Sequence, residues 1–248
     1  MRSFLLCSIA LTFLSAQSQD FESFAVVELF TSQGCSSCPR ADQNLSELIK
    51  TSEKNGDNVM ALSFHVDYWD RLGWKDPYSS AQFTERQKKY ASTLRSSNIY
   101  TPQMIVNGKV EFVGSQQSKL ETEVKKALNH APETALKLVE TELKQGNLRV
   151  KYEVVGKVGT KLKLNLAIVQ KDIETAVPKG ENRGRTLRHD NVVRAFQSIP
   201  INKAGLISLS IEVLEGIDFT NSSLIGYVQE GSHESVIAAN NAPLSGLK

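Results

Sequence analysis

Two cysteines separated by two serines are the residues of this chain best suited to chemistry. Cys35 and Cys38 follow an apolar run at residues 24–30 and a short loop at residues 31–34. A thiol between the end of a strand and the start of a helix lies near unpaired N–H groups and the positive end of the helix dipole, which favour the thiolate. The spacing therefore predicts a redox-active pair, in which Cys35 attacks and Cys38, one helical turn away, resolves the mixed disulfide.

The same pair has other interpretations. It could form a structural disulfide, or it could supply half of a zinc site. A zinc site of that kind needs two further Cys or His ligands at short spacing, and the sequence has no second pair of this type. His65 beside two thiols would suit a soft metal, which makes a copper chaperone a further alternative. We expect no cofactor and no metal.

The first 18 residues have the pattern of a signal peptide. A short basic start with Arg2 precedes an apolar run at residues 4–14 and small residues at 15–18. The run is too short to span a bilayer. Cleavage would remove Cys7 and leave an even pair of thiols, which suits an oxidising compartment. We expect a periplasmic or secreted protein with no membrane span after cleavage.

Length and charge limit the partners. The 248 residues are enough for two domains of ordinary size. A formal net charge of +2 provides no footprint for nucleic acid. We therefore expect protein thiols or disulfides as partners, together with an unidentified redox partner, and no nucleic acid.

The elements that must position the thiols alternate between strands and helices. Hydrophobic periodicity and the Asn107–Gly108 turn signal predict an α/β arrangement up to about residue 133. The expected strands lie at 25–30 and 58–66, the helices at 42–52, 81–96 and 117–130, and a β-hairpin at 103–113.

The pattern changes after Pro132, where evenly spaced short strands replace the helices. Such spacing is typical of an antiparallel sandwich. We therefore expect a second domain over residues 134–248, after a first domain over residues 19–133. The expected strands of the second domain lie at 135–143, 148–155, 161–170, 186–198, 206–213 and 224–229.

The element order of the first domain, with the two cysteines after its first strand, resembles the thioredoxin fold. Pro102 precedes the hairpin at the place where that fold has a cis-proline facing the cysteines, and proline is the residue for which a cis bond is cheap. Residues 27–39, 65–77 and 100–103 are similar to a family of secreted bacterial thioredoxin-like proteins that is described only as a domain of unknown function. The resemblance implies an α/β thioredoxin-like domain, followed here by an all-β antiparallel sandwich-like domain.

Several residues near the thiols are candidates for the site. Tyr68 and Trp69 directly follow the second strand, and loops at the carboxyl ends of such strands border the site, so we expect them to bind substrate. His65 and Asp67 are two positions apart on that strand and would share one face, which makes them candidates for a proton relay. The resemblance implies that Pro102 belongs to the catalytic site and that Thr101 holds a substrate backbone beside the sulfurs.

A basic, glycine-flanked segment at residues 180–194 is the notable feature of the second half. We expect a solvated hairpin there, with contact to an acidic partner or to the first domain as the alternative. For the whole chain, the leading hypothesis is a thiol–disulfide oxidoreductase. The competing hypothesis is a non-catalytic binding module with a structural disulfide.

Overall fold

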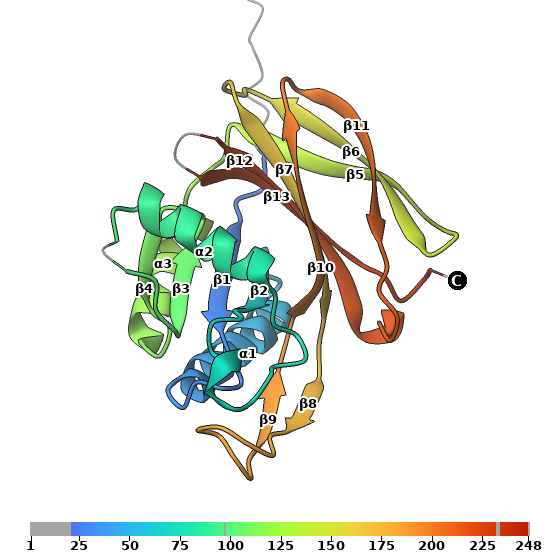
Figure 1. The fold of residues 1–248 in the computed structure, drawn as a ribbon. Coiled ribbons are helices and arrows are strands. Elements are labelled where there is room, and N and C mark those ends of the chain that lie inside the picture. The colour runs from blue at the N-terminus through green and yellow to red at the C-terminus, as the bar shows by residue number, and fades with distance from the viewer. Residues whose placement is uncertain (1–20, 97, 232–233, 248) are drawn as a thin grey trace, which may run out of the picture.

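A computed structural model describes residues 21–96, 98–231 and 234–247 of the chain, and the expected signal peptide at 1–18 lies outside them. Strands are the commonest secondary structure, and three α-helices occur in the described ranges (Figure 1). None of these helices is long and apolar enough to cross a membrane. The α-helices are α1 (Cys38–Asn55), α2 (Ala81–Thr93) and α3 (Gln117–Leu128), and two short 3₁₀ helices are η1 (Asp70–Leu72) and η2 (Phe219–Asn221).

Strands β1 to β4 alternate with these helices in the predicted order, within a few residues of the predicted bounds. They are β1 (Ala25–Thr31), β2 (Val59–His65), β3 (Gln103–Val106) and β4 (Val110–Val113). The remaining strands are β5 (Thr134–Lys144), β6 (Asn147–Gly156), β7 (Leu162–Gln170), β8 (Ile173–Ala176), β9 (Thr186–His189), β10 (Val192–Ile201), β11 (Gly205–Glu212), β12 (Ser222–Glu230) and β13 (Ser235–Pro243).

One mixed sheet of eight strands runs through both halves of the chain, in the order β13-β12-β7-β10-β2-β1-β3-β4. The join is a parallel pairing of β10 with β2, where Val192 lies opposite Ser63. The expectation of an α/β thioredoxin-like domain followed by an all-β antiparallel sandwich-like domain is therefore wrong. The physical reason is that β2 would otherwise present an unpaired edge, and β10 covers that edge instead of pairing within a separate sandwich.

Two smaller sheets complete the molecule. A three-stranded sheet in the order β11-β6-β5 packs against the part of the large sheet that contains β7, β10, β12 and β13. Strands β8 and β9 form a separate hairpin, drawn at the bottom of Figure 1. The single strand expected at 186–198 is divided between β9 and β10, because Asn191 takes a positive φ of 50° between them.

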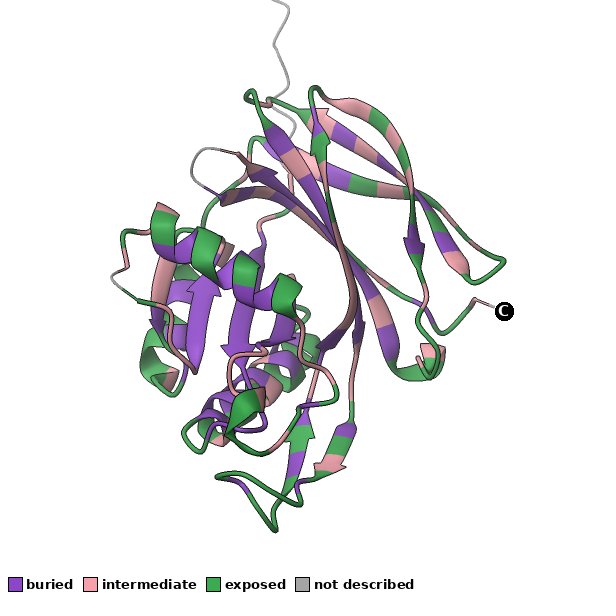
Figure 2. Ribbon diagram, in the orientation of Figure 1, coloured by how far each residue is buried: buried purple, intermediate pink, exposed green. Residues whose placement is uncertain are grey.

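Side chains along β1 and β2 alternate between the two faces of the sheet, and both faces are packed. All seven residues of β1 are buried, because helices cover both faces of the sheet there (Figure 2). Val26 and Phe30 pack with Phe64 under α2, whereas Val27 and Leu29 face α1 and α3. Alternation therefore also places Thr31 and His65, at the ends of β1 and β2, on the face that carries α1.

Parallel pairing of β1 with β2 brings their carboxyl ends to the same edge of the sheet, and Thr31 lies opposite His65. The loops that follow these two strands therefore meet at that edge, where the cysteines lie. On the antiparallel side, the predicted hairpin is confirmed between β3 and β4. Asn107 and Gly108 both take positive φ, 47° and 65°, as a tight hairpin turn requires.

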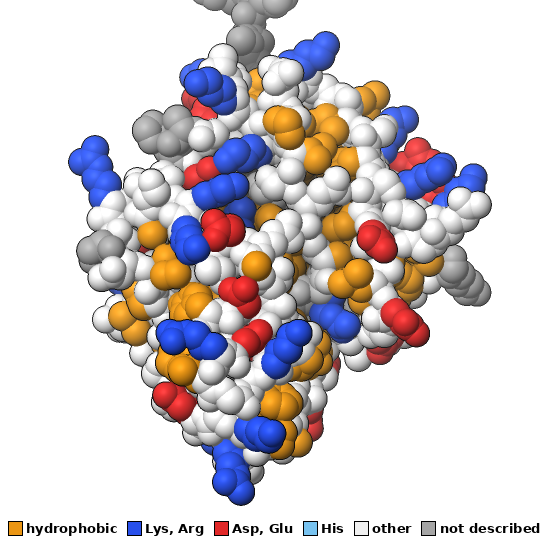
Figure 3. Space-filling view, in the orientation of Figure 1, with side chains coloured by type: hydrophobic (Ala, Val, Ile, Leu, Met, Phe, Trp, Pro, Cys, Tyr) orange, Lys and Arg blue, Asp and Glu red, His pale blue; other side chains and the backbone are white. Residues whose placement is uncertain are grey.

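Charged side chains of both signs are mixed on the face of the molecule shown in Figure 3. Lys and Arg side chains alternate there with Asp and Glu and with small apolar patches. This mixture matches the near balance of charge in the sequence.

Candidate redox site

The two cysteines lie at the connection between β1 and α1. Cys35 sits in the connecting turn, where its N–H donates to the Ser32 carbonyl at 3.2 Å. Cys38 is the first residue of α1, and Pro39 follows it, at a helix start where a missing N–H costs nothing. Both thiols are free, and both residues are fully buried, at 0% exposure.

The pKa values of the two thiols are shifted in opposite directions. The hydrogen bond from the Cys38 thiol, helped by the side chains of Ser37 and Thr101, lowers the pKa of Cys35 to about 6 against the opposing effect of burial. Burial raises the pKa of Cys38, and the hydrogen bond to Cys35 and the charge of Asp42 raise it further. Cys35 is therefore the thiolate at neutral pH, and Cys38 keeps its proton.

The Thr101–Pro102 bond is cis, which confirms that prediction. It also faces the thiols, because Cys35 Sγ lies 3.9 Å from the carbonyl oxygen of Thr101. The side chain of Thr101 is held by Trp69, whose Nε1 donates to Thr101 Oγ1 at 2.8 Å. The structure thus brings together three of the predicted site residues around Cys35.

Tyr68 and Trp69 are partly buried and pack against the core on the α2 side of the sheet. Burial raises the pKa of Tyr68 to about 12, with smaller contributions from the neighbouring Cys38 and Cys35 charges. Trp69 also explains the glycine before the first cysteine. A Cβ on Gly34 would lie only 3.3 Å from the Trp69 Cβ, so a side chain there would crowd the indole.

His65 and Asp67, the predicted proton relay, have separate partners. His65 is fully buried, and its Nδ1 lies 2.7 Å from Asp76 Oδ2. Burial lowers the pKa of His65, but the charge and hydrogen bond of Asp76 outweigh it, so the pKa is raised overall. Asp67 accepts a hydrogen bond from Thr84 instead, and neither side chain hydrogen-bonds a cysteine in the described part of the chain.

Asp76 connects this histidine to the cysteine loop. Its Oδ2 also accepts from the backbone N–H of Gln33 at 2.8 Å. The side chain of Gln33 in turn accepts from Trp74 Nε1 at 3.1 Å. The segment after β2 therefore holds the loop before Cys35 from two sides.

Residues 173–189, which we call the arm, comprise β8, β9 and the loop between them. The loop is largely exposed, as predicted, but Asn182 is fully buried. Its Nδ2 donates to the carbonyl oxygens of Gln33 and Cys35, both at 2.9 Å. Glu181 Oε2 accepts from the N–H of Ser36 at 2.9 Å. The alternative expectation, contact with the first half of the chain, is confirmed.

Sequence reasoning missed four residues of this site. Asp42 follows Cys38 by one helical turn, a spacing that could have identified it. Asn182 and His189 have no such signal, because they reach the site only through the joined sheet. Asp76 sits in an irregular segment after β2 whose path the sequence does not determine. No group of three or more His, Cys, Asp or Glu side chains in the described ranges is arranged to hold a metal ion.

Comparison with known protein families gives one match that spans most of the chain. Residues 26–229 match the family described as "Protein of unknown function (DUF1223)". The chain belongs to this family. The match includes the cysteine pair, the cis bond and the arm. It does not establish membership of the thioredoxin superfamily, and a comparison with curated proteins finds no match.

Among solved structures, a structural-genomics protein of Agrobacterium tumefaciens is similar over 90% of this chain and 96% of its own. Its TM-score is 0.67 and its sequence identity 24%, so the likeness shows the fold alone. A β-glucuronidase of Ruminococcus gnavus (TM-score 0.25, 14% identity, 45% of this chain and 15% of its own) is too dissimilar to indicate a shared fold. The same holds for a domain of the outer membrane lipoprotein Omp28 of Porphyromonas gingivalis (TM-score 0.27, 11% identity, 44% and 94%).

Proposed function

We propose that this protein is a thiol–disulfide oxidoreductase that works in the periplasm or outside the cell. The observation that supports the activity is the unequal pair of thiols: the pKa of Cys35 is lowered to about 6, and that of Cys38 is raised. A thiolate that exists at neutral pH is the attacking species in disulfide exchange. The compartment is supported by the signal-peptide pattern at 1–18 and by the isolated cysteine pair.

In the reductive direction, the Cys35 thiolate attacks a disulfide in a substrate protein. A Cys35–substrate disulfide forms, and the first substrate sulfur leaves as a thiolate. Cys38 then attacks Cys35 Sγ, loses its proton and forms the Cys35–Cys38 disulfide, and the second substrate sulfur leaves. The substrate gains two electrons and the pair loses two. In the opposite direction, the Cys35–Cys38 disulfide oxidises two substrate thiols by the same steps in reverse. A dithiol partner would reduce the pair again after the first reaction, and a disulfide partner would oxidise it again after the second.

Substrate would approach along Thr101 and Pro102, whose backbone lies beside Cys35 Sγ. Tyr68 and Trp69 would contact the substrate on the same side, because the Trp69 indole already holds Thr101. We expect the arm to move aside for this approach, because Cys35 is fully buried and Asn182 of the arm binds its carbonyl oxygen. That burial favours a second candidate, a binding module whose cysteine pair never meets a substrate.

Trapping of mixed disulfides tests the proposal. In a Cys7→Ser background, Cys38→Ser should accumulate disulfide-linked partners in extracts of the exported protein, seen on non-reducing gels and identified by mass spectrometry. Cys35→Ser should trap none, because the remaining thiol is buried and protonated. The double variant is the control. Equal trapping by both single variants would contradict the assigned roles, and no trapping by either would favour the binding module.

A further inference from the structure

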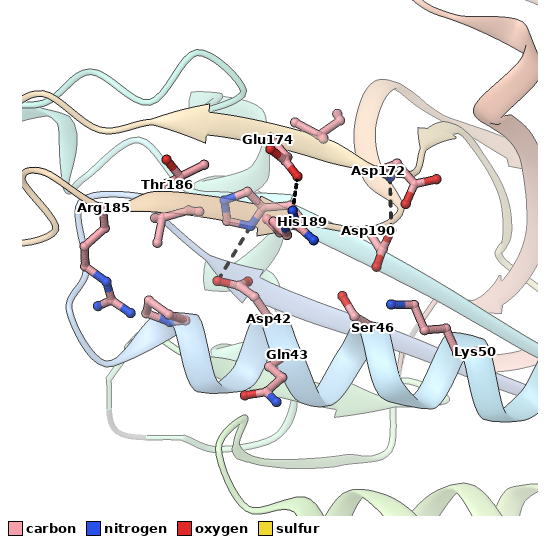
Figure 4. Close-up of a pocket in the computed structure, with 14 residues that line it drawn as sticks. Asp42, Gln43, Ser46, Lys50, Asp172, Glu174, Arg185, Thr186, His189 and Asp190 are labelled. Carbon is pink, nitrogen blue, oxygen red and sulfur yellow. Dashed lines mark hydrogen bonds and ion pairs between the residues drawn. The ribbon is translucent and has the colours of Figure 1, made fainter.

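A pocket lies behind the cysteine pair, between α1 and the two strands of the arm. Its volume is about 360 Å³. Figure 4 shows the side chains that line it. The side chains of Asp42 from α1 and His189 from β9 point toward each other at its inner wall, with Asp42 Oδ2 3.6 Å from His189 Nδ1. Both residues are nearly completely buried, at 5% and 2% exposure.

Polar atoms in this pair lack hydrogen-bond partners. Asp42 Oδ2 and both ring nitrogens of His189 have none in the described part of the chain. A buried polar atom without a partner costs free energy, so a purely structural role would favour apolar side chains at these positions. The pair is therefore better explained by reversible binding of a group to these polar atoms, and the smallest such group is a proton.

The pair is connected to the resolving cysteine. Asp42 lies one helical turn after Cys38, on the same face of α1. Its other oxygen, Oδ1, accepts from Thr31 Oγ1 at 2.9 Å. The negative charge of Asp42 is felt at Cys38, where it opposes loss of the thiol proton to solvent, whereas the Thr31 side chain favours the thiolate. Asp42 is thus a neighbour of Cys38 along α1 and also lines the pocket with His189.

We propose that Asp42 accepts the proton of Cys38 during resolution of the mixed disulfide, and that His189 carries it on to the pocket. This inference rests on the proposed function. As the Cys38–Cys35 bond forms and the Cys35–substrate bond breaks, the Cys38 proton moves to the Asp42 carboxylate. His189 then takes that proton and releases it to water in the pocket, which restores the carboxylate. In the opposite direction, the same route returns a proton to Cys38.

The surroundings of Asp42 are compatible with such a transfer. His65 lies beside His189, with the ring centroids 4.8 Å apart. Burial lowers the pKa of His65, but the charge and hydrogen bond of Asp76 raise it overall. Three titratable groups are close to Asp42: Cys38 on α1, His65 on β2 and His189 on β9. The other charged groups that line the pocket are Lys50 on α1 and Asp172, Glu174, Arg185, Arg188 and Asp190 from the arm and the residues beside it.

The two exchange steps can be followed separately with Ellman's reagent. The reduced protein in a Cys7→Ser background should release one thionitrobenzoate when Cys35 attacks and a second when Cys38 resolves the adduct. Asp42→Asn keeps an oxygen for Thr31 but is a poor base. It should leave the first phase within twofold of the wild-type rate and slow the second by about 10²-fold at pH 7. The second phase should then accelerate about tenfold per pH unit, because hydroxide replaces the carboxylate.

His189→Ala gives an independent test. It should slow the second phase about tenfold, and added imidazole, which fits the vacated pocket, should restore it. Imidazole should leave Asp42→Asn unchanged. Asp57→Asn, which changes an exposed carboxylate beyond the end of α1, is the matched control and should behave like the wild type. If Asp42→Asn does not fold, the imidazole experiment on His189→Ala decides the question.

Second phases with wild-type rates and pH profiles in both variants would overturn the relay and leave the oxidoreductase proposal intact. The absence of a second phase in the wild type would contradict the oxidoreductase proposal itself, and the relay with it.

Discussion

The sulfurs of Cys35 and Cys38 meet different surroundings although only two residues separate them in the sequence. Cys35 receives hydrogen bonds from the Cys38 thiol and from neighbouring side chains, and these stabilise its thiolate. Cys38 is more deeply buried, and burial raises the pKa of its thiol by disfavouring the charged thiolate. The difference in pKa therefore comes from the hydrogen bonds to Cys35 and from the burial of Cys38.

The reduced protein should show this difference as a pH profile. Alkylation of Cys35 by iodoacetamide should be half-maximal near pH 6 and fall as the pH falls below that value, because only the thiolate reacts. Cys38→Ala removes the main donor to that thiolate, so the midpoint should move up toward the ordinary value of about 8.5. An unchanged midpoint in Cys38→Ala would show that another group sets the pKa.

The same pKa has a consequence for stability in the reduced state. Its value in the folded protein is lower than that of a thiol in an unfolded chain, so ionisation of Cys35 stabilises the fold at high pH. That contribution is fully present above about pH 8.5 and is lost as the pH falls through about 6.

Single residues were predictable where the signal is local. The cysteine pair, the cis bond at Pro102 and the aromatic residues after β2 all lie within a few positions of a recognisable strand end. Asn182 is different, because it meets Cys35 across 147 positions of sequence. No local pattern marks a polar residue whose partners are backbone carbonyls so far away.

The arm binds the cysteine turn, and we expect it to limit access to the thiols. It is a two-stranded hairpin, and its loop reaches the cysteine turn through Asn182 and Glu181. Gly180 allows a close approach, since its φ is +77° and a Cβ there would lie 3.3 Å from the Trp74 Cβ. Few side chains of the loop are buried, so the hydrogen bonds at its tip hold it in place.

Weakening this contact should expose Cys35. Asn182→Ala removes two hydrogen bonds, each worth about 1 kcal/mol, so the open state should gain roughly tenfold or more in population. Alkylation of Cys35 at pH 8, where it is already a thiolate, should accelerate by a similar factor. Asn55→Ala, at an exposed position at the end of α1, is the control. Equal rates in the wild type and Asn182→Ala would show that the arm does not limit access.

Sequence patterns located most elements but not the arm. A continuous strand was expected across residues 186–198, although residues 188–191 are all polar. The break at Asn191 depends on a backbone conformation that the pattern does not reveal. Once the strand is broken, β9 is free to pair with β8 while β10 pairs with β7 and β2.

At the scale of the whole molecule, both halves share one sheet and one buried ionic network. Glu28 in the middle of β1 accepts two hydrogen bonds from Arg86 of α2, at 2.6 and 2.9 Å. Arg86 also donates to Gln229 of β12 at 3.2 Å. Periodicity along each segment predicted the strands but not their partners, since pairing across the halves depends on which edges remain open.

The structure does not test the expected domain boundary near residue 133, but expression of residues 19–133 alone would. This fragment lacks β10, so the edge of β2 is unpaired, and Arg86 loses Gln229. We expect it to be unfolded or aggregated by circular dichroism and size-exclusion chromatography. The full chain cut by a protease at a site inserted near residue 132 should remain folded and associated. A monomeric fragment that unfolds cooperatively at the temperature of the full chain would instead establish an autonomous domain.

The contacts at the tip of the arm are made to backbone atoms of the cysteine loop. Asn182 binds the carbonyl oxygens of Gln33 and Cys35, and Glu181 binds the N–H of Ser36. Backbone groups stay the same when side chains change, so the cover does not depend on which two residues separate the cysteines. Ser37, by contrast, touches the reactive sulfur, with Oγ 3.2 Å from Cys35 Sγ. If the protein is the oxidoreductase proposed above, substitutions in that dipeptide can change its redox potential while the contacts of the arm with the backbone remain.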